Sequence, residues 1–147
     1  MPRILFLAGL LGLVFASHPA SAQAPIPIIS AEQALQQSRA GERLLFDVRS
    51  PSEWHETGVP ETAQPVTIHD TRGLPAFVAE VIARTDGDRS RPVAFICASG
   101  VRSAYASQLL REAGYQDVAN VKEGMFGSDA GEGWRKKGLP ISPCPTC

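Results

Sequence analysis

The sequence predicts an α/β fold in which a mostly parallel sheet carries helices on both faces. Two apolar runs, residues 44–48 and 92–96, are continuous rather than alternating, as expected of strands buried on both sides. Segments with helical signals separate such runs, and alternating strands and helices favour a parallel sheet. With 147 residues, 44% of them hydrophobic, the chain can form one domain with a substantial core.

Local signals place the elements in order along the chain. The first helix is expected over residues 31–39, because Ser30 and Gln33 form a capping-box pair and Ala40-Gly41 ends the helix. Next comes the strand at 44–48, whose single acid, Asp47, needs a partner. The remaining elements are a helical turn at 52–55, a strand at 65–68, an amphipathic helix at 74–84, a strand at 92–96, a helix at 103–113 and a strand at 118–121.

The first 22 residues have the pattern of a secretory signal peptide. Arg3 supplies a positive start, residues 4–16 form an apolar stretch too short to span a bilayer comfortably, and Ala20-Ser21-Ala22 is a small-residue cleavage site. An uncleaved membrane anchor is the alternative. We expect cleavage after Ala22 and a periplasmic or secreted protein that is not stably inserted in a membrane.

Three further regions are expected after the signal peptide. Residues 23–29 contain two prolines and should form an extended linker. The folded domain is expected over residues 30–141, and a short tail with a Cys-x-x-Cys pair over residues 142–147.

Composition argues against several classes of partner. The net charge is −1 and no block of basic residues occurs, so nucleic acid is not an expected partner. The pair Cys144 and Cys147 has no second pair at zinc spacing, and neither a metal nor a cofactor is expected.

Cys97 is the candidate nucleophile. It ends the apolar run 92–96 and opens a loop that leads into the helix at 103–113. The unpaired amides and dipole of a helix start stabilise an anion, and Arg102 adds a full positive charge, so the thiolate is favoured. Gly100 allows the backbone to curl so that successive amides point inward and form an anion cradle.

Structural roles compete with catalytic ones at several positions. A lone cysteine after an apolar strand is often a small buried hydrophobe, but the glycine and arginine around Cys97 favour a nucleophile. Asp47 and Arg49 are expected to form an ion pair that supports the loops around the site. His55 and His69 have no spacing that brings either to Cys97, so a histidine base is not expected.

The tail pair Cys144 and Cys147 has two interpretations. It can form a small local disulfide or two surface thiols. It can also be a redox pair that exchanges with Cys97 or accepts sulfur from it, although such pairs usually sit at a helix start. Both interpretations remain open at the level of sequence.

Several motifs together resemble the single-domain, exported form of the rhodanese (thiosulfate sulfurtransferase) family. They cover residues 29–141 and comprise Asp47-Val48-Arg49-Ser50, the acidic-aromatic pair Glu53-Trp54, Gly58-Val59-Pro60, Cys97-x4-Arg102-Ser103, the helix end 109–115, and Gly124 with Trp134. The resemblance implies a three-layer sandwich with a central, mostly parallel sheet. The segment 124–134 is longer and richer in glycine than the family turn, so it can form one wall of the site mouth. Phe126 or Trp134 could shape access to the site, but packing of Trp134 into the core beside the last helix is the favoured alternative for that residue.

The resemblance also implies a reaction. Cys97 would take the outer sulfur of thiosulfate or a related donor as a persulfide and pass it to cyanide, a thiol or a protein thiol. The backbone of Ala98, Ser99, Gly100, Val101 and Arg102 would form the substrate cradle, with Arg102 orienting the sulfonate. The expected partners are a small sulfur-containing anion as donor, a thiol or cyanide as acceptor, and a periplasmic redox protein as a further candidate.

Two other functions compete with sulfur transfer. Related cysteine phosphatases have a Cys-x5-Arg loop, one residue longer than the spacing between Cys97 and Arg102. The shorter loop favours the compact sulfane sulfur over a phosphoryl group. A non-catalytic rhodanese-fold module, acting in redox sensing or in binding an anion or partner, is the alternative.

Overall fold

A four-stranded parallel sheet forms the centre of the computed structural model, which describes residues 24–147. The predicted signal peptide lies outside the described residues. The strands are β1 (Leu44–Asp47), β3 (Ala63–Pro65), β4 (Val93–Ile96) and β5 (Val118–Asn120), in the spatial order β3-β1-β4-β5. All three neighbouring pairs are parallel, which confirms the predicted fold class.

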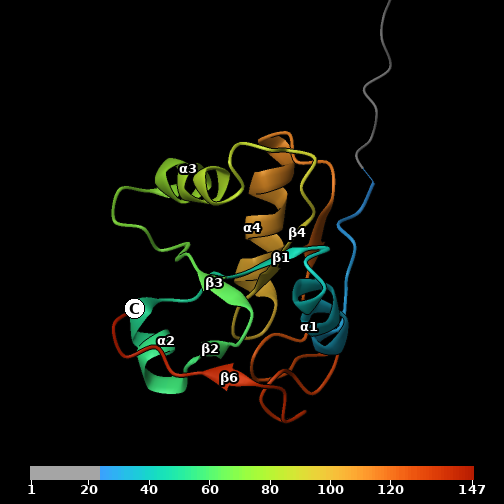
Figure 1. Cartoon of the computed structure of the whole chain (residues 1–147), viewed down its shortest axis with the longest axis vertical. Helices are drawn as coiled ribbons and strands as arrows, with labels where there is room; N and C mark the ends of the chain where they lie inside the picture. The colour runs from blue at the N-terminus through green and yellow to red at the C-terminus, as the bar shows by residue number, and fades with distance from the viewer. Residues whose placement is uncertain (1–23) are drawn as a thin grey trace, which may run out of the picture.

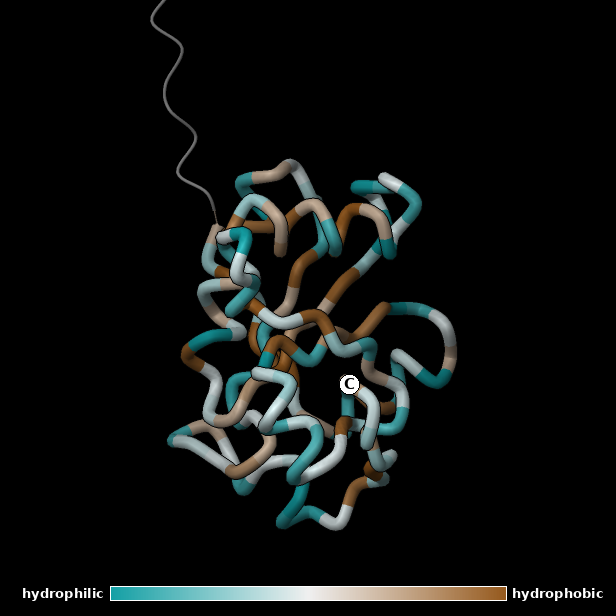
Figure 2. Tube along the Cα trace, turned by 90° about the vertical axis from the view of Figure 1, so that its left-hand side faces the viewer, coloured by the Kyte–Doolittle hydropathy of each residue, from teal (hydrophilic) through white to brown (hydrophobic). Residues whose placement is uncertain are grey.

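Helices cover both faces of this sheet (Figure 1). Strand residues alternate between two cores: Phe46 and Phe95 pack with α3 (Leu74–Arg84) and α4 (Val101–Glu112), whereas Leu45 and Ile96 pack with α1 (Ala31–Arg39). Figure 2 shows the apolar strands running through the middle of the molecule, with hydrophilic segments mainly in the outer loops. The three predicted layers are therefore present.

Capping boxes start two of the helices. In α1 the Ser30 side chain accepts from the Gln33 amide, and the Gln33 side chain bonds back to the Ser30 amide, as predicted. The same arrangement joins Ser50 and Glu53 at the start of α2 (Pro51–Thr57). The predicted helical turn at 52–55 is thus a helix of seven residues, because this second capping box and the proline at its first position extend it.

Two predicted elements begin two residues earlier in the structure than the sequence indicates. The strand predicted at 65–68 lies earlier, at β3, although Val66 and Ile68 still donate to Asp47 and Val48 at 3.0 and 3.2 Å beyond the end of β1. Helix α4 starts at Val101 rather than at residue 103, because Gly100 adopts a left-handed conformation (φ 89°) that serves as its N-cap.

Two strands were not predicted at all. β2 (Val59–Pro60) pairs antiparallel with β6 (Ile141–Ser142), which binds the end of the chain to the segment after α2. Strands of two residues carry no periodic signal, so the sequence could not indicate them. Ser142 belongs to this strand pair, and the folded part of the chain therefore extends past the predicted boundary at 141.

The described residues of the predicted linker, 24–29, are extended and are hydrogen-bonded to β5. The amide of Ile29 donates to Asn120 at 3.1 Å, and the amide of Asn120 donates to Pro27 at 2.9 Å. β5 is the edge strand of the four-stranded sheet, and the lead-in segment pairs with backbone groups on its outer side. Pro25 and Pro27 lack amide hydrogens, so Ile29 supplies the donor that this pairing needs.

Candidate active site

Cys97 lies at the carboxyl end of the sheet, where ligands bind in open α/β folds. Asp47 is paired with Ile96 across β1 and β4, and the Val48 amide donates to the Ile96 carbonyl at 2.9 Å. This register brings the segment after β1 beside the Cys97 loop. The Cys97 side chain is 1% exposed and packs in the core shared with α4.

Two donors point at the sulfur of Cys97. The backbone amide of Gly100 donates to Sγ at 3.2 Å, and the hydroxyl of Ser103 donates to it at 3.4 Å. Both donors favour negative charge on the sulfur. Ser103 was not among the predicted site residues, although its place in the first turn of the following helix is the signal that could have identified it.

A glycine is required at position 100. Gly100 has φ 89°, and a Cβ atom there would collide with the carbonyl of Lys122. The side chain of Asn120 donates to the Gly100 carbonyl at 3.3 Å. The backbone of the cradle is therefore held against the segment that follows β5.

The Gly-rich segment after β5 supports the same loop. The amides of Met125 and Phe126 donate to the carbonyls of Cys97 and Ala98 at 2.9 and 3.0 Å. This segment forms one wall of the site, whereas Trp134 is buried and its indole donates to Pro140. Of the two aromatic residues considered for access to the site, only Phe126 is exposed.

Asp47 and Arg49 form a fully buried ion pair. Arg49 Nη2 donates to Asp47 Oδ2 at 2.7 Å and to the Gly58 carbonyl at 2.6 Å, while Nη1 donates to Thr57 Oγ1 at 2.7 Å. The guanidinium thus joins the end of β1 to the end of α2. This arrangement suits a role in positioning the loops, because both charges are used within the pair and its hydrogen bonds.

Arg102 makes an ion pair that the sequence analysis did not anticipate. Its Nη1 and Nη2 atoms donate to the two carboxylate oxygens of Glu53, both at 2.7 Å, and Glu53 also accepts from the Ser50 amide at 2.9 Å. The hydrogen bond from Arg102 is the main cause that lowers the pKa of Glu53 from 4.5 to about 2. His69 Nε2 lies 3.4 Å from Arg102 Nη1, whereas the exposed His55 lies in the last turn of α2.

Apolar side chains are exposed on the segments that surround the cysteine loop. Among residues 24–147 the exposed large hydrophobic side chains are Ile28, Val101, Tyr105 and Phe126. Val101 belongs to the loop and Phe126 is hydrogen-bonded to Ala98, whereas Tyr105, one helical turn further along α4, lines a separate groove. We call Val101 and Phe126 the apolar rim.

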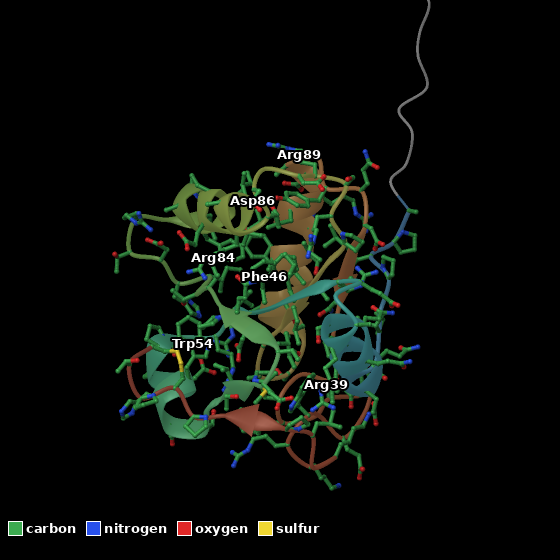
Figure 3. All side chains as sticks on the ribbon, viewed as in Figure 1. Arg39, Phe46, Trp54, Arg84, Asp86 and Arg89 are labelled. Atoms are coloured by element: carbon green, nitrogen blue, oxygen red, sulfur yellow. A yellow bond between two sulfur atoms is a disulfide. The ribbon has the colours of Figure 1, made fainter. Side chains whose placement is uncertain are left out.

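The tail cysteines form a disulfide. Cys144 and Cys147 are joined with their Cα atoms 5.4 Å apart, and in the view of Figure 3 the bond is drawn close to Trp54 of α2. The donors to the sulfur of Cys97 come from its own loop and from α4, and Cys97 is a free thiol.

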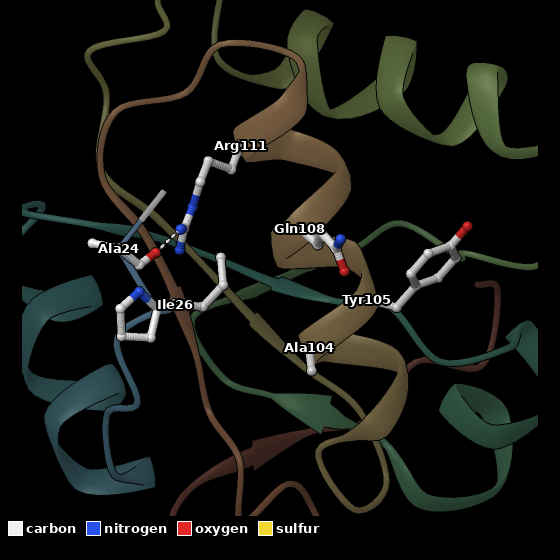
Figure 4. A pocket seen from close by; sticks show the side chains of 7 residues that line it. Ala24, Ile26, Ala104, Tyr105, Gln108 and Arg111 are labelled. Carbon is white, nitrogen blue, oxygen red and sulfur yellow. Dashed lines mark hydrogen bonds between the residues drawn. The ribbon is translucent and has the colours of Figure 1, made fainter. Parts of the chain in front are cut away.

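A separate groove lies between the lead-in segment and α4 (Figure 4). It has a volume of about 480 Å³ and is lined by Ala24, Pro25, Ile26, Ala104, Tyr105, Gln108 and Arg111. Its lining includes no residue of the segment 97–102, so this groove is not the candidate active site.

Within the described part of the chain, no three His, Cys, Asp or Glu side chains come together in a group that could hold a metal ion. No helix among residues 24–147 is long and apolar enough to cross a membrane.

A parallel α/β sheet whose central strand ends in a cysteine loop, with backbone and hydroxyl donors on the sulfur, defines the class of rhodanese-like proteins. The chain belongs to this family: residues 30–129 match the rhodanese-like domain.

Similar proteins agree with this assignment. A sulfurtransferase of Allochromatium vinosum is 30% identical over 99 residues, which cover 67% of this chain and 77% of the relative. The crystal structure of Rv0390 from M. tuberculosis is 31% identical with a TM-score of 0.65, covering 82% of this chain and all of that one. The polysulfide-sulfur transferase homodimer of Wolinella succinogenes is 25% identical with a TM-score of 0.59, covering 80% and 78% of the two chains.

Proposed function

We propose that this protein is a sulfurtransferase that carries sulfane sulfur as a persulfide on Cys97. The observation that carries the proposal is the environment of the sulfur: Cys97 Sγ is buried and accepts from the Gly100 amide and the Ser103 hydroxyl. These donors stabilise a thiolate without a histidine base. Membership of the rhodanese-like family, which includes sulfurtransferase relatives, supports the same chemistry.

The reaction has two displacement steps. The Cys97 thiolate attacks the outer sulfur of thiosulfate or a related donor. A new S–S bond forms at Cys97, the S–S bond of the donor breaks, and the rest of the donor, which is sulfite in the case of thiosulfate, leaves with the electron pair. A thiol or cyanide then attacks the outer sulfur of the persulfide, and Cys97 leaves as the thiolate that began the cycle.

The mature protein would act outside the cytoplasm. The signal-peptide pattern of residues 1–22 supports export to a periplasm or the exterior. The disulfide between Cys144 and Cys147 is compatible with such an oxidising compartment. A periplasmic redox protein that reduces this pair is a candidate partner.

Intact mass spectrometry tests the proposal. The reduced protein should gain the mass of about one sulfur atom after thiosulfate or an alkyl persulfide, and lose it again after cyanide. The Cys97→Ser variant should gain nothing, since serine cannot form a persulfide.

The opposite result has a clear meaning. A folded, reduced protein that takes up no sulfur from any donor would reject sulfur transfer and favour a binding module. If Cys97→Ser gained sulfur as readily as the wild type, the carrier would be another cysteine.

A further inference from the structure

Glu53 neutralises the positive charge that Arg102 brings to the site. Both ends of the Arg102 guanidinium bond to Glu53, at 2.7 Å each. Glu53 is ionised at any pH well above 2, because its pKa is lowered to about 2. Arg102 and Glu53 are only partly exposed, with side-chain exposures of 27% and 29%. The pair therefore presents little net charge to an incoming donor.

The capping of α2 holds Glu53 in this position. Its carboxylate accepts from both the amide and the hydroxyl of Ser50 at 2.9 Å. These bonds come from the residue that caps α2, so they hold Glu53 at the first turn of the helix in addition to its bonds with Arg102.

An arginine whose charge is neutralised by a carboxylate contributes little to the binding of a small dianion. Thiosulfate carries two negative charges, and its binding gains from each uncompensated positive charge within a few ångströms. An organic persulfide, R–S–SH, places no second anionic group at the position of the sulfonate. Its carbon chain can instead contact apolar surface.

The apolar rim supplies that surface. Val101 and Phe126 are 75% and 49% exposed, and they come from the cysteine loop and from the segment bonded to Ala98. Two of the four exposed large hydrophobic side chains among residues 24–147 thus belong to the cysteine loop or to the segment hydrogen-bonded to it. The rim and the ion pair are independent observations that favour the same kind of donor.

We propose that Glu53 is a specificity-determining residue that, together with the apolar rim, directs the site toward organic persulfides rather than thiosulfate. This inference rests on the proposed sulfurtransferase function and names its donor class.

The proposed exchange is balanced without an oxidant or a reductant. The Cys97 thiolate attacks the outer sulfur of R–S–SH, and a new S–S bond forms at Cys97 Sγ. The S–S bond of the donor breaks, and R–S⁻ leaves with its electron pair while the proton stays on the transferred sulfur. One sulfane sulfur has moved, and the number of thiolates is unchanged.

A comparison of donors in matched variants tests the inference. The probes are thiosulfate and N-acetylcysteamine persulfide, whose organic group is uncharged, and the readout is kcat/KM for persulfide formation on the full mature chain. Glu53→Gln keeps the capping box and removes the charge, so kcat/KM for thiosulfate should rise about tenfold while that for the alkyl persulfide changes little. Glu56→Gln, an exposed acid on the same helix, is the control and should change neither.

The rim is tested separately. Phe126→Ala should lower kcat/KM for the alkyl persulfide several-fold more than kcat/KM for thiosulfate, because only the organic group loses apolar contact. Ile28→Ala, which removes an exposed apolar side chain at the β5 edge, should affect neither donor.

Salt dependence gives a readout on the wild-type protein that does not depend on the folding of any variant. If the mouth of the site is nearly neutral, the rate with thiosulfate should respond weakly to ionic strength, and Glu53→Gln should make the response steep. A wild-type protein that prefers thiosulfate, with a steep fall of its rate in salt, would overturn the inference while leaving sulfur transfer intact. An unchanged ratio of kcat/KM for the two donors in Glu53→Gln would likewise overturn the inference while leaving sulfur transfer intact. Failure of every donor to load Cys97 would instead reject the proposed function, and this inference with it.

Discussion

At the scale of single residues, the site depends on backbone groups as much as on side chains. The donors on Cys97 are an amide and a hydroxyl, and the amide is aimed by the left-handed conformation of Gly100. The fixed position of this amide matters because a donor that is already in place stabilises charge without reorganising during the reaction. The glycine is therefore a functional residue even though it has no side chain.

Gly100→Ala should damage both stability and activity. The left-handed backbone conformation at position 100 costs an L-residue about 1 kcal/mol of unfolding free energy, and the collision of the new Cβ with the Lys122 carbonyl adds to this cost. Gly87→Ala is the matched control, because Gly87 also has a positive φ (73°) but no atom within 4 Å of its Cβ position.

Urea denaturation and persulfide formation measure the two effects. Gly87→Ala should lose about 1 kcal/mol of unfolding free energy and keep full sulfur uptake. Gly100→Ala should lose more unfolding free energy and take up little sulfur. Equal losses of stability in the two variants would argue against the close contact between the loop and Lys122.

At the scale of elements, a buried carboxylate connects α1 to the Gly-rich segment. Glu123 accepts from the Ala31 amide at 2.6 Å, from the Gly133 amide at 2.9 Å and from Lys137 Nζ at 2.7 Å. Burial alone would raise the pKa of Glu123, but the hydrogen bonds from Lys137 and the two amides lower it overall. The carboxylate also interacts favourably with the N-terminal end of α1.

Glu123→Gln should cost about 2 kcal/mol of unfolding free energy, since charge-assisted hydrogen bonds are lost. Glu132→Gln removes an exposed acid of the same segment, paired with Lys136, and should cost less than about 0.5 kcal/mol. Because the pKa of Glu123 is lowered in the folded protein, its stabilisation should be full above about pH 4.5 and decline as the pH falls through the folded value.

Chemical denaturation at several pH values checks this prediction. The difference between the wild type and Glu123→Gln should shrink in acid. A difference that grew as the pH fell below 4.5 would contradict the lowered pKa.

At the scale of the whole molecule, three distant segments form the site. The parallel sheet places the ends of β1 and β4 at one edge, and the segment after β5 closes over the cysteine loop. The lead-in segment pairs with the outer edge of β5, on the same strand that supports this loop. Folding of the sheet and assembly of the site are therefore the same event.

Processing of the N-terminus is a prediction about the complete chain. Expression with its own leader in an export-competent bacterium should yield a protein whose first residue is Gln23, as mass spectrometry of the periplasmic fraction would determine. Ala22→Leu should impair cleavage at this position, because signal peptidase requires a small residue there. Recovery of full-length protein in the membrane fraction would favour the uncleaved anchor.

The sequence by itself determined the fold class, the start of α1, the full extent of α3 and the place of Cys97 in a loop between a buried strand and a helix. Capping pairs, apolar runs and terminating glycines act over a few residues, so they can be recognised without a structure. They also revealed the motifs by which the family is recognised.

Only the tertiary structure decided the charge of the site and the residues that hold it together. Glu53 and Arg102 are 49 positions apart, Glu123 and Ala31 are 92 apart, and β2 and β6 are joined across most of the chain. Each of these contacts forms only after the sheet brings distant segments together, and no local pattern encodes which surface acid will face which base. For that reason the sequence showed Glu53 only as part of an acidic-aromatic motif, and the fold made it the partner of Arg102.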